Sequence, residues 1–249
     1  EITWAEKLYN AAEKNNADIA FSGYDRIDLE TGKQVNVEMT QYGTMTKKVD
    51  YNDDFIVYIN PSLWNKIYKR EKVKDIEFLP FRGCNDTLFL INALFDKIET
   101  LTFIPDVLYH YYLRQSSQIH NIGPKDIENL KKYLLVTKEN LINKGKYEEC
   151  KYLMDEMAFL HLGISWMYMV SYDKNVKMTE MLKETKKYLN ENFPTWKKNK
   201  FLSFSHNVKK GIKFIAIWFV QRLYRMNLAI IYVKLYRFVV DVLKIDIKW

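Results

Sequence analysis

One carboxylate in this sequence stands where it could do chemistry. Asp86 follows Asn85 and precedes an apolar run, a pattern that predicts a helix beginning at this pair. A carboxylate held at a helix start can take a proton from a bound hydroxyl, which is the task of a general base. The residue also suits a structural place, because Asn is a favoured N-cap and an acid in the first turn complements the helix dipole. A helix N-terminus is further expected to lower the pKa of Asp86.

An aromatic and basic segment precedes this acid. Residues 64–70 read WNKIYKR, and their spacing predicts a short helix with Trp64 and Tyr68 on one side and the basic side chains largely on another. An ordinary amphipathic helix accounts for the same pattern.

A tyrosine-rich segment follows. Residues 107–112 predict a strand that places Tyr109 and Tyr111 on one face. We expect a separate strand over residues 100–104, divided from it by Pro105 and Asp106. The polar turn after the second strand contains Arg114 and Ser117. An Arg in such a loop suits a bidentate contact with a phosphate.

The order and separation of these three motifs resemble the second half of the catalytic domain of family-two glycosyltransferases with the GT-A fold, in particular bacterial enzymes that build capsular and other surface polysaccharides. Members of that family have W-N-K-(I/L)-Y-(K/R)-R, then an acidic pair opening a helix, then Y-x-Y-x-x-R-x-x-S. The resemblance covers about sixty residues of this chain. One departure is Asn85, where the family has Glu before Asp.

The resemblance implies a reaction and a set of roles. It implies inverting transfer of a sugar from a nucleotide-sugar donor to a glycan or lipid-linked acceptor, with Asp86 as general base. It also implies that Trp64, Asn65, Lys66, Arg114 and Ser117 bind donor or acceptor. The family's D-x-D motif, which holds a divalent cation (Mg or Mn) and the donor diphosphate, is expected to precede residue 1. We therefore expect a chain that is weakly active or inactive alone. The alternative is a non-catalytic, membrane-peripheral scaffold or pseudoenzyme derived from such a transferase.

The elements that must position these residues follow from hydrophobic patterning. A helix over residues 1–15 and a buried strand over residues 17–24 come first, and a β-hairpin or an insertion at the sheet edge is expected between residues 25 and 46. From Pro124 onward the pattern turns helical, with helices expected over 125–144, 147–170 and 177–192. The predicted fold is α/β: a truncated GT-A-like mixed sheet with flanking helices, followed by a mainly helical C-terminal region. The predicted regions are 1–122, 123–196 and 197–249.

Charge is concentrated at the C-terminal end. The whole chain of 249 residues has a net charge of +7, whereas residues 197–249 alone hold twelve Lys and Arg against two Asp. Apolar residues at helical spacing accompany these charges, which favours interfacial helices on an anionic membrane surface over a helix pair packed on the domain, and over nucleic acid. Two Cys without framework spacing favour a reducing compartment. The predicted location is cytoplasmic, peripheral on the inner face of the cell membrane.

Overall fold

The structure is a computed structural model that describes residues 1–78, 85–113 and 122–243. The chain forms two compact units, Glu1–His120 and Asn121–Trp249. We refer to them as unit 1 and unit 2. The sequence analysis treated residues 123–196 and 197–249 as separate regions, whereas the structure groups both ranges in unit 2.

Unit 1 is built on a five-stranded mixed sheet. Its strands are β1 (Ile19–Asp28), β2 (Gln34–Glu38), β3 (Met45–Lys48), β4 (Lys66–Tyr68) and β5 (Thr100–Leu113). The order is β2-β1-β5-β3, with β4 also pairing with β1, and only the β1–β5 pair among these strands is parallel. The predicted strand and the predicted hairpin are confirmed as β1 and as the β1–β2 pair.

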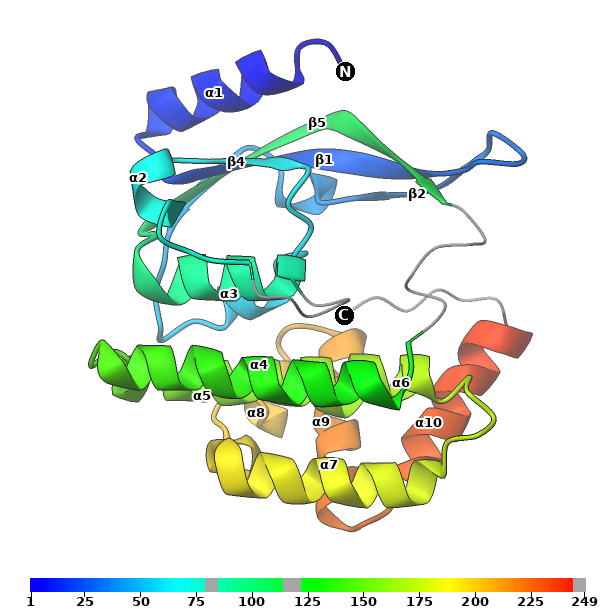
Figure 1. Cartoon of the computed structure of the whole chain (residues 1–249). Coiled ribbons are helices and arrows are strands. Elements are labelled where there is room, and N and C mark those ends of the chain that lie inside the picture. The colour runs from blue at the N-terminus through cyan, green and yellow to red at the C-terminus, as the bar shows by residue number, and fades with distance from the viewer. Residues whose placement is uncertain (79–84, 114–121, 244–249) are drawn as a thin grey trace. The chain divides into compact units, whose positions relative to one another are not determined.

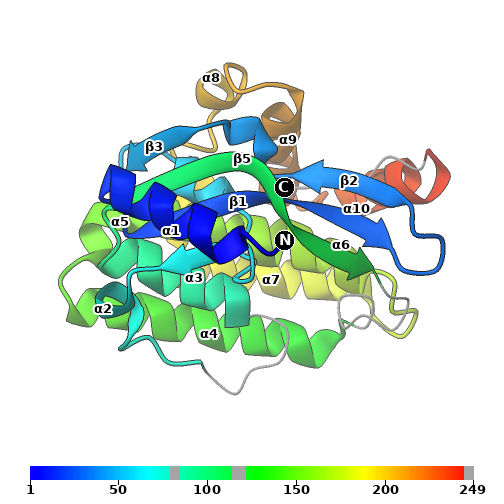
Figure 2. The same cartoon turned by 90° about the horizontal axis from the view of Figure 1, so that it is seen from above.

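Helices cover both faces of this sheet. They are α1 (Trp4–Asn15), α2 (Arg70–Val73) and α3 (Asn85–Asp96). Within unit 1, α1 and α3 lie on opposite sides of the sheet (Figure 1), and α1 lies across β5 and β1 (Figure 2). The apolar run of α3 is buried almost all round, from Leu88 to Phe95. The predicted first helix and the helix opening at Asn85 and Asp86 are both present.

The helix predicted over residues 64–70 is wrong. Residues Lys66–Tyr68 form strand β4, antiparallel to the first part of β1, and only α2, from Arg70, is helical. Backbone bonds extend this pairing on both sides: Lys69 N–H donates to the Asp18 carbonyl at 2.8 Å, and Ser22 N–H donates to the Asn65 carbonyl at 3.0 Å. Pairing with the free edge of β1 therefore overrides a local helical spacing, as tertiary context often does.

The two strands predicted over residues 100–112 are one strand in the structure. β5 continues through Pro105 and Asp106, and the register with β1 shifts on either side of Gly23. A Cβ at Gly23 would lie 3.1 Å from each of the Pro105 and Asp106 carbonyl oxygens. Glycine thus lets β1 approach the irregular stretch of β5, and the strand is not broken there.

All regular elements in the described residues of unit 2 are helical. The longer ones are α4 (Pro124–Asn143), α5 (Tyr147–Ala158), a π-helical segment (Phe159–Trp166), α7 (Met178–Asn192), α9 (Ile212–Arg225) and α10 (Ile230–Arg237). Shorter helical segments are α6 (Met167–Val170), Pro194–Lys198, α8 (Phe204–Asn207) and Phe238–Val242. The three helices predicted between residues 125 and 192 are confirmed to within two residues at each end. At the start of α4, the Asp126 carboxylate accepts from Gly123 N–H at 3.0 Å.

The π-helical segment Phe159–Trp166 forms hydrogen bonds with both C-terminal helices, α9 and α10. The carbonyl of Gly163 accepts hydrogen bonds from the hydroxyls of Tyr224 on α9, at 2.6 Å, and Tyr232 on α10, at 2.8 Å. Both tyrosines are buried. α9 and α10 thus each pack one face into unit 2. Among the described helices, none is long and apolar enough to cross a membrane.

Candidate functional site

An aromatic cluster joins two of the sequence motifs. The ring of Trp64 stacks on Tyr109, with centroids 4.3 Å apart, and on Tyr111, with centroids 5.3 Å apart. Tyr24 of β1 meets Trp64 edge-on at 4.6 Å. Tyr24 and Tyr109 are direct neighbours across the parallel β1–β5 pair. We call Trp64, Tyr24, Tyr109 and Tyr111 the Trp64 cluster.

A polar group adjoins the Trp64 cluster. The Tyr24 hydroxyl donates to the Glu38 carboxylate, and Asn60 Nδ2 donates to Tyr24 Oη at 2.7 Å. Arg26 Nε lies 3.0 Å from Glu38 Oε1, and its guanidinium carbon lies 5.8 Å from the centre of the Tyr111 ring. Tyr24, Arg26, Glu38 and Asn60 were not predicted from the sequence. The alternation of Tyr24, Arg26 and Glu38 along β1 and β2 was readable, but the strand register and the loop position of Asn60, which bring these residues to Trp64 and Tyr111, were not.

Asn65 and Lys66 are buried and engaged inside unit 1. Asn65 Nδ2 donates to the Ser22 carbonyl at 2.9 Å, while its Oδ1 accepts from Ser62 Oγ at 2.9 Å and from Lys66 Nζ at 2.7 Å. Lys66 Nζ also donates to the carbonyls of Asn60, at 2.9 Å, and Ser62. Burial holds the pKa of Lys66 well below its usual range, and the charge of Asp86 opposes this effect. These two side chains therefore fix the backbone next to Trp64.

Asp86 lies in the first turn of α3 and is exposed. Among the described residues, none makes a hydrogen bond to its carboxylate. Partial desolvation raises the pKa of Asp86, and the charge of Lys66 opposes the rise. The expected lowering of this pKa by the helix terminus is therefore wrong, because desolvation by neighbouring atoms outweighs it.

Two unpaired polar groups accompany Asp86. The Tyr68 hydroxyl and Asn85 Oδ1 are buried without a hydrogen-bond partner in the described part of unit 1. Burial raises the pKa of Tyr68, and the charge of Asp86 raises it further. The ring of Tyr68 packs edge-on against Phe89 of α3, with centroids 5.3 Å apart. β4 and the start of α3 thus bring Lys66, Tyr68 and Asp86 within electrostatic reach of one another.

Two further predicted site residues, Arg114 and Ser117, are outside the described residues. Within residues 1–78, 85–113 and 122–243, no three His, Cys, Asp or Glu side chains are grouped so that they could hold a metal ion. The described residues alone therefore do not supply a site for the divalent cation.

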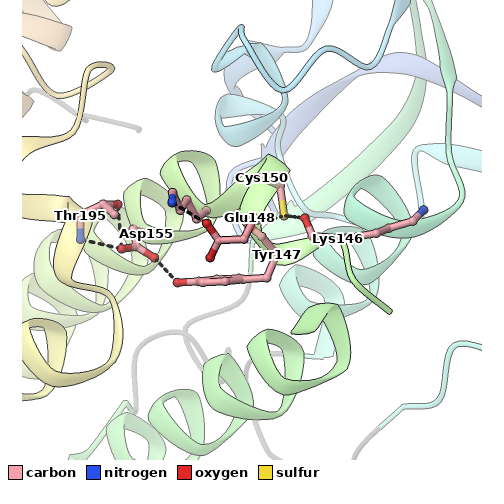
Figure 3. Close-up of polar contacts among 7 residues, drawn as sticks. Lys146, Tyr147, Glu148, Cys150, Asp155 and Thr195 are labelled. Carbon is pink, nitrogen blue, oxygen red and sulfur yellow. Dashed lines mark hydrogen bonds and ion pairs between the residues drawn. The ribbon is translucent and has the colours of Figure 1, made fainter. Parts of the chain in front are cut away.

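A buried acid in unit 2, Asp155, makes the polar contacts drawn in Figure 3. Asp155 is fully buried and accepts from the Tyr147 hydroxyl at 3.0 Å, from Thr195 N–H at 2.8 Å and from Thr195 Oγ1 at 2.7 Å. Desolvation raises the pKa of Asp155, and the bonds from Thr195 oppose the rise. Near the start of the same helix, burial raises the pKa of the Cys150 thiol to about 12, which leaves it a poor nucleophile.

Unit 2 also has a small pocket near the turn between α9 and α10. Lys186 lines it, with Nζ donating to the Arg225 carbonyl at 2.9 Å and to Asn227 Oδ1 at 2.7 Å. This amine closes the C-terminal end of α9, so its polar contacts are structural.

The fold is similar to that of a known nucleotide-sugar complex. The structure of S. aureus TarS, residues 1–349, in complex with UDP-GlcNAc matches this chain with a TM-score of 0.54 and 16% sequence identity. The match covers 90% of this chain and 64% of that one. No family model and no curated protein matches the chain. The similarity supports a glycosyltransferase-like α/β fold.

Proposed function

We propose that this chain is part of a glycosyltransferase that transfers a sugar from a nucleotide-sugar donor to a glycan or lipid-linked acceptor in surface polysaccharide synthesis. The observation that carries the proposal is the Asp86 carboxylate, exposed and without a hydrogen-bond partner among the described residues, at a helix start of a glycosyltransferase-like fold. The likeness to TarS bound to UDP-GlcNAc supports the donor class. The acceptor follows from the family resemblance.

In the proposed reaction, Asp86 accepts the proton of an acceptor hydroxyl. The hydroxyl oxygen forms a bond to the anomeric carbon as the bond from that carbon to the donor's diphosphate oxygen breaks, so the configuration inverts. The raised pKa of Asp86 makes its carboxylate a stronger base than a solvated one. The positive charge of Lys66 favours the ionised form that the step requires.

The other predicted residues take supporting roles in this proposal. Trp64 offers part of an aromatic ring surface, which suits contact with the apolar face of a sugar. Asn65 and Lys66 act as positioning residues, because their polar atoms are occupied inside unit 1. Arg114 and Ser117 keep their proposed role at the donor phosphates.

A divalent cation, Mg or Mn, remains part of the proposal. When bound, it would offset charge on the donor diphosphate. The described residues do not form a site for it by themselves, so no step is assigned to it. Loss of donor binding on chelation with EDTA, and its return with added Mg or Mn, would support the cation.

The test compares two carboxylates in equivalent local settings. Asp86 and Glu6 each lie in the first turn of a twelve-residue helix, α3 and α1 respectively. In the polypeptide that the gene encodes, Asp86→Asn should lower the rate of sugar transfer at least about 100-fold, whereas Glu6→Gln should change it less than about twofold. Donor affinity of Asp86→Asn, measured by titration calorimetry with a panel of nucleotide sugars, should stay within about threefold of wild type.

An unchanged transfer rate in Asp86→Asn would contradict the base assignment. The absence of both transfer and nucleotide-sugar binding in wild type would favour the non-catalytic scaffold instead. Asn85, in place of the family's Glu, is the feature that favours this alternative. Circular dichroism of both variants should match wild type, so that a lost rate reports chemistry and not unfolding.

A further inference from the structure

The C-terminal helices of unit 2 have an outward apolar stripe. Its residues follow one another three or four positions apart, and all are exposed: Leu228, which precedes α10, Ile231 and Leu235 of α10, and Phe238 and Val242 of the helical segment after it. This spacing places the four residues from Ile231 to Val242 on one side of a helix. Leu235 and Phe238 each have an exposed fraction of 52%. We call these five residues the tail stripe.

α9 continues this pattern. Ile212, Phe219 and Met226 are seven positions apart, which puts them along one line of the helix, and all three are exposed. The faces of α9 and α10 away from these exposed residues pack inside unit 2. Tyr224, Tyr232 and Tyr236 on these faces are buried in unit 2. The outward apolar residues are therefore additional to the packing that holds α9 and α10 in place.

Basic residues are interspersed with these apolar residues along the sequence. Residues 204–243 contain seven Lys and Arg, with Asp241 as the single acid. Lys209, Lys213, Arg225 and Lys234 are exposed. An apolar stripe bordered by Lys and Arg is the arrangement that lies in the headgroup region of an anionic bilayer. A second copy of this chain would bring the same positive charges together, which disfavours a self-association through this face.

We propose that the tail stripe docks the chain on an anionic lipid surface, with Leu235 and Phe238 inserted at the level of the acyl chains and Lys209 and Lys234 at the lipid headgroups. This inference is independent of the proposed sugar transfer. It agrees with the location predicted from the sequence, on the inner face of the cell membrane. The sequence left two alternatives for these helices, packing on the domain or lying on a membrane. In this proposal both hold: the inward faces of α9 and α10 pack in unit 2, and their outward faces contact lipid.

Co-flotation of the full chain with lipid vesicles tests the proposal. The chain should float with phosphatidylcholine vesicles that contain about 30% phosphatidylglycerol, and much less with phosphatidylcholine alone. The double variant Leu235→Glu/Phe238→Glu should lower the partition coefficient at least about tenfold. Lys209→Gln/Lys234→Gln should lower it on the order of tenfold at low salt and less at high salt.

Ile142→Glu on α4 is the matched control. Ile142 has an exposed fraction of 51%, close to that of Leu235, and lies in the same unit but outside the tail stripe. This variant should bind vesicles within about threefold of wild type, since it adds a negative charge away from the stripe. Circular dichroism should show every variant folded.

Several results would overturn the proposal. One is a wild-type chain that does not float with anionic vesicles. Another is an equal loss of flotation in Leu235→Glu/Phe238→Glu and Ile142→Glu, because binding would then depend on charge alone. A third is a stripe variant that changes the oligomeric state in sedimentation without changing flotation, which would assign the stripe to a second copy. Salt-sensitive DNA binding that is lost in the stripe variant while flotation persists would assign it to nucleic acid.

Discussion

Asp86 in unit 1 and Asp155 in unit 2 share one property and differ in another. Desolvation raises the pKa of each carboxyl group above its ordinary value. Asp155 is fully buried and accepts three hydrogen bonds from Tyr147 and Thr195. Asp86 is exposed, and no hydrogen bond to its carboxylate occurs among the residues that the structure describes.

The difference teaches which of two perturbed acids is available for chemistry. Burial perturbs the pKa of structural and functional acids alike. A carboxylate whose lone pairs already accept several hydrogen bonds is engaged in holding helices together, whereas one without such partners can accept a proton from a ligand. On this basis Asp155 connects α5 to the segment Pro194–Lys198, and Asp86 is the candidate base.

The largest stability effect is expected at Asp155. Asp155→Ala leaves the Tyr147 hydroxyl and both donors of Thr195 without their acceptor, inside unit 2. We expect the free energy of unfolding to fall by about 3–5 kcal/mol. Urea unfolding followed by tryptophan fluorescence and circular dichroism measures it. Asp86→Ala, under the same conditions, should cost less than about 1 kcal/mol. Equal losses for the two variants would remove the distinction between these acids.

A smaller effect is expected at Asn65, the buried polar residue near Asp86. Asn65→Ala removes an acceptor from Lys66 and Ser62 and a donor from the Ser22 carbonyl. We expect a loss of about 2–3 kcal/mol in the free energy of unfolding. Donor affinity per folded molecule should change little, because Asn65 is buried. A variant that is as stable as wild type but has lost donor binding would instead make Asn65 a direct ligand contact.

The smallest effect is the pH dependence contributed by Asp86. Because its pKa is raised in the folded state, the folded chain binds the proton more tightly than the unfolded chain does. Stability therefore falls as pH rises through the unfolded pKa toward the folded one. Relative to wild type, Asp86→Asn should gain stability as pH rises through this window, by less than about 1 kcal/mol because the group is exposed. If Asp86→Asn instead loses stability relative to wild type as pH rises, the pKa of Asp86 is lowered in the folded state.

Local signals in the sequence predicted most of unit 2. Pro124 marks the start of α4, and apolar residues at helical spacing define α5 and α7, so these helices follow from neighbouring residues alone. The run from Tyr147 to Val170 was predicted as one helix, and it is helical throughout. Its π-helical middle was not predicted. Its bonds from Tyr224 and Tyr232 to the Gly163 carbonyl join residues 61 and 69 positions apart, so no local pattern contains them.

The candidate site was predictable only in part, because some of its contacts join residues that are distant in the sequence. Asp86 and Trp64 are each recognisable from their immediate neighbours. The strand at Lys66–Tyr68 depends on the edge of β1, more than forty residues away in sequence, and so a local spacing predicted a helix instead. Glu38 joins the site through its bond with Tyr24, and no short motif contains both residues.

The most direct test of the distinction between the two acids is the transfer rate per folded molecule of Asp86→Asn and Asp155→Asn, each measured beside its own unfolding curve in the polypeptide that the gene encodes. We predict a crossed pattern. Asp86→Asn should lose at least about 100-fold in rate with little change in stability, and Asp155→Asn should lose stability with the rate of its folded fraction retained within about threefold. A full rate in Asp86→Asn, or equal rate losses in both variants, would contradict the assignment of Asp86 as the base.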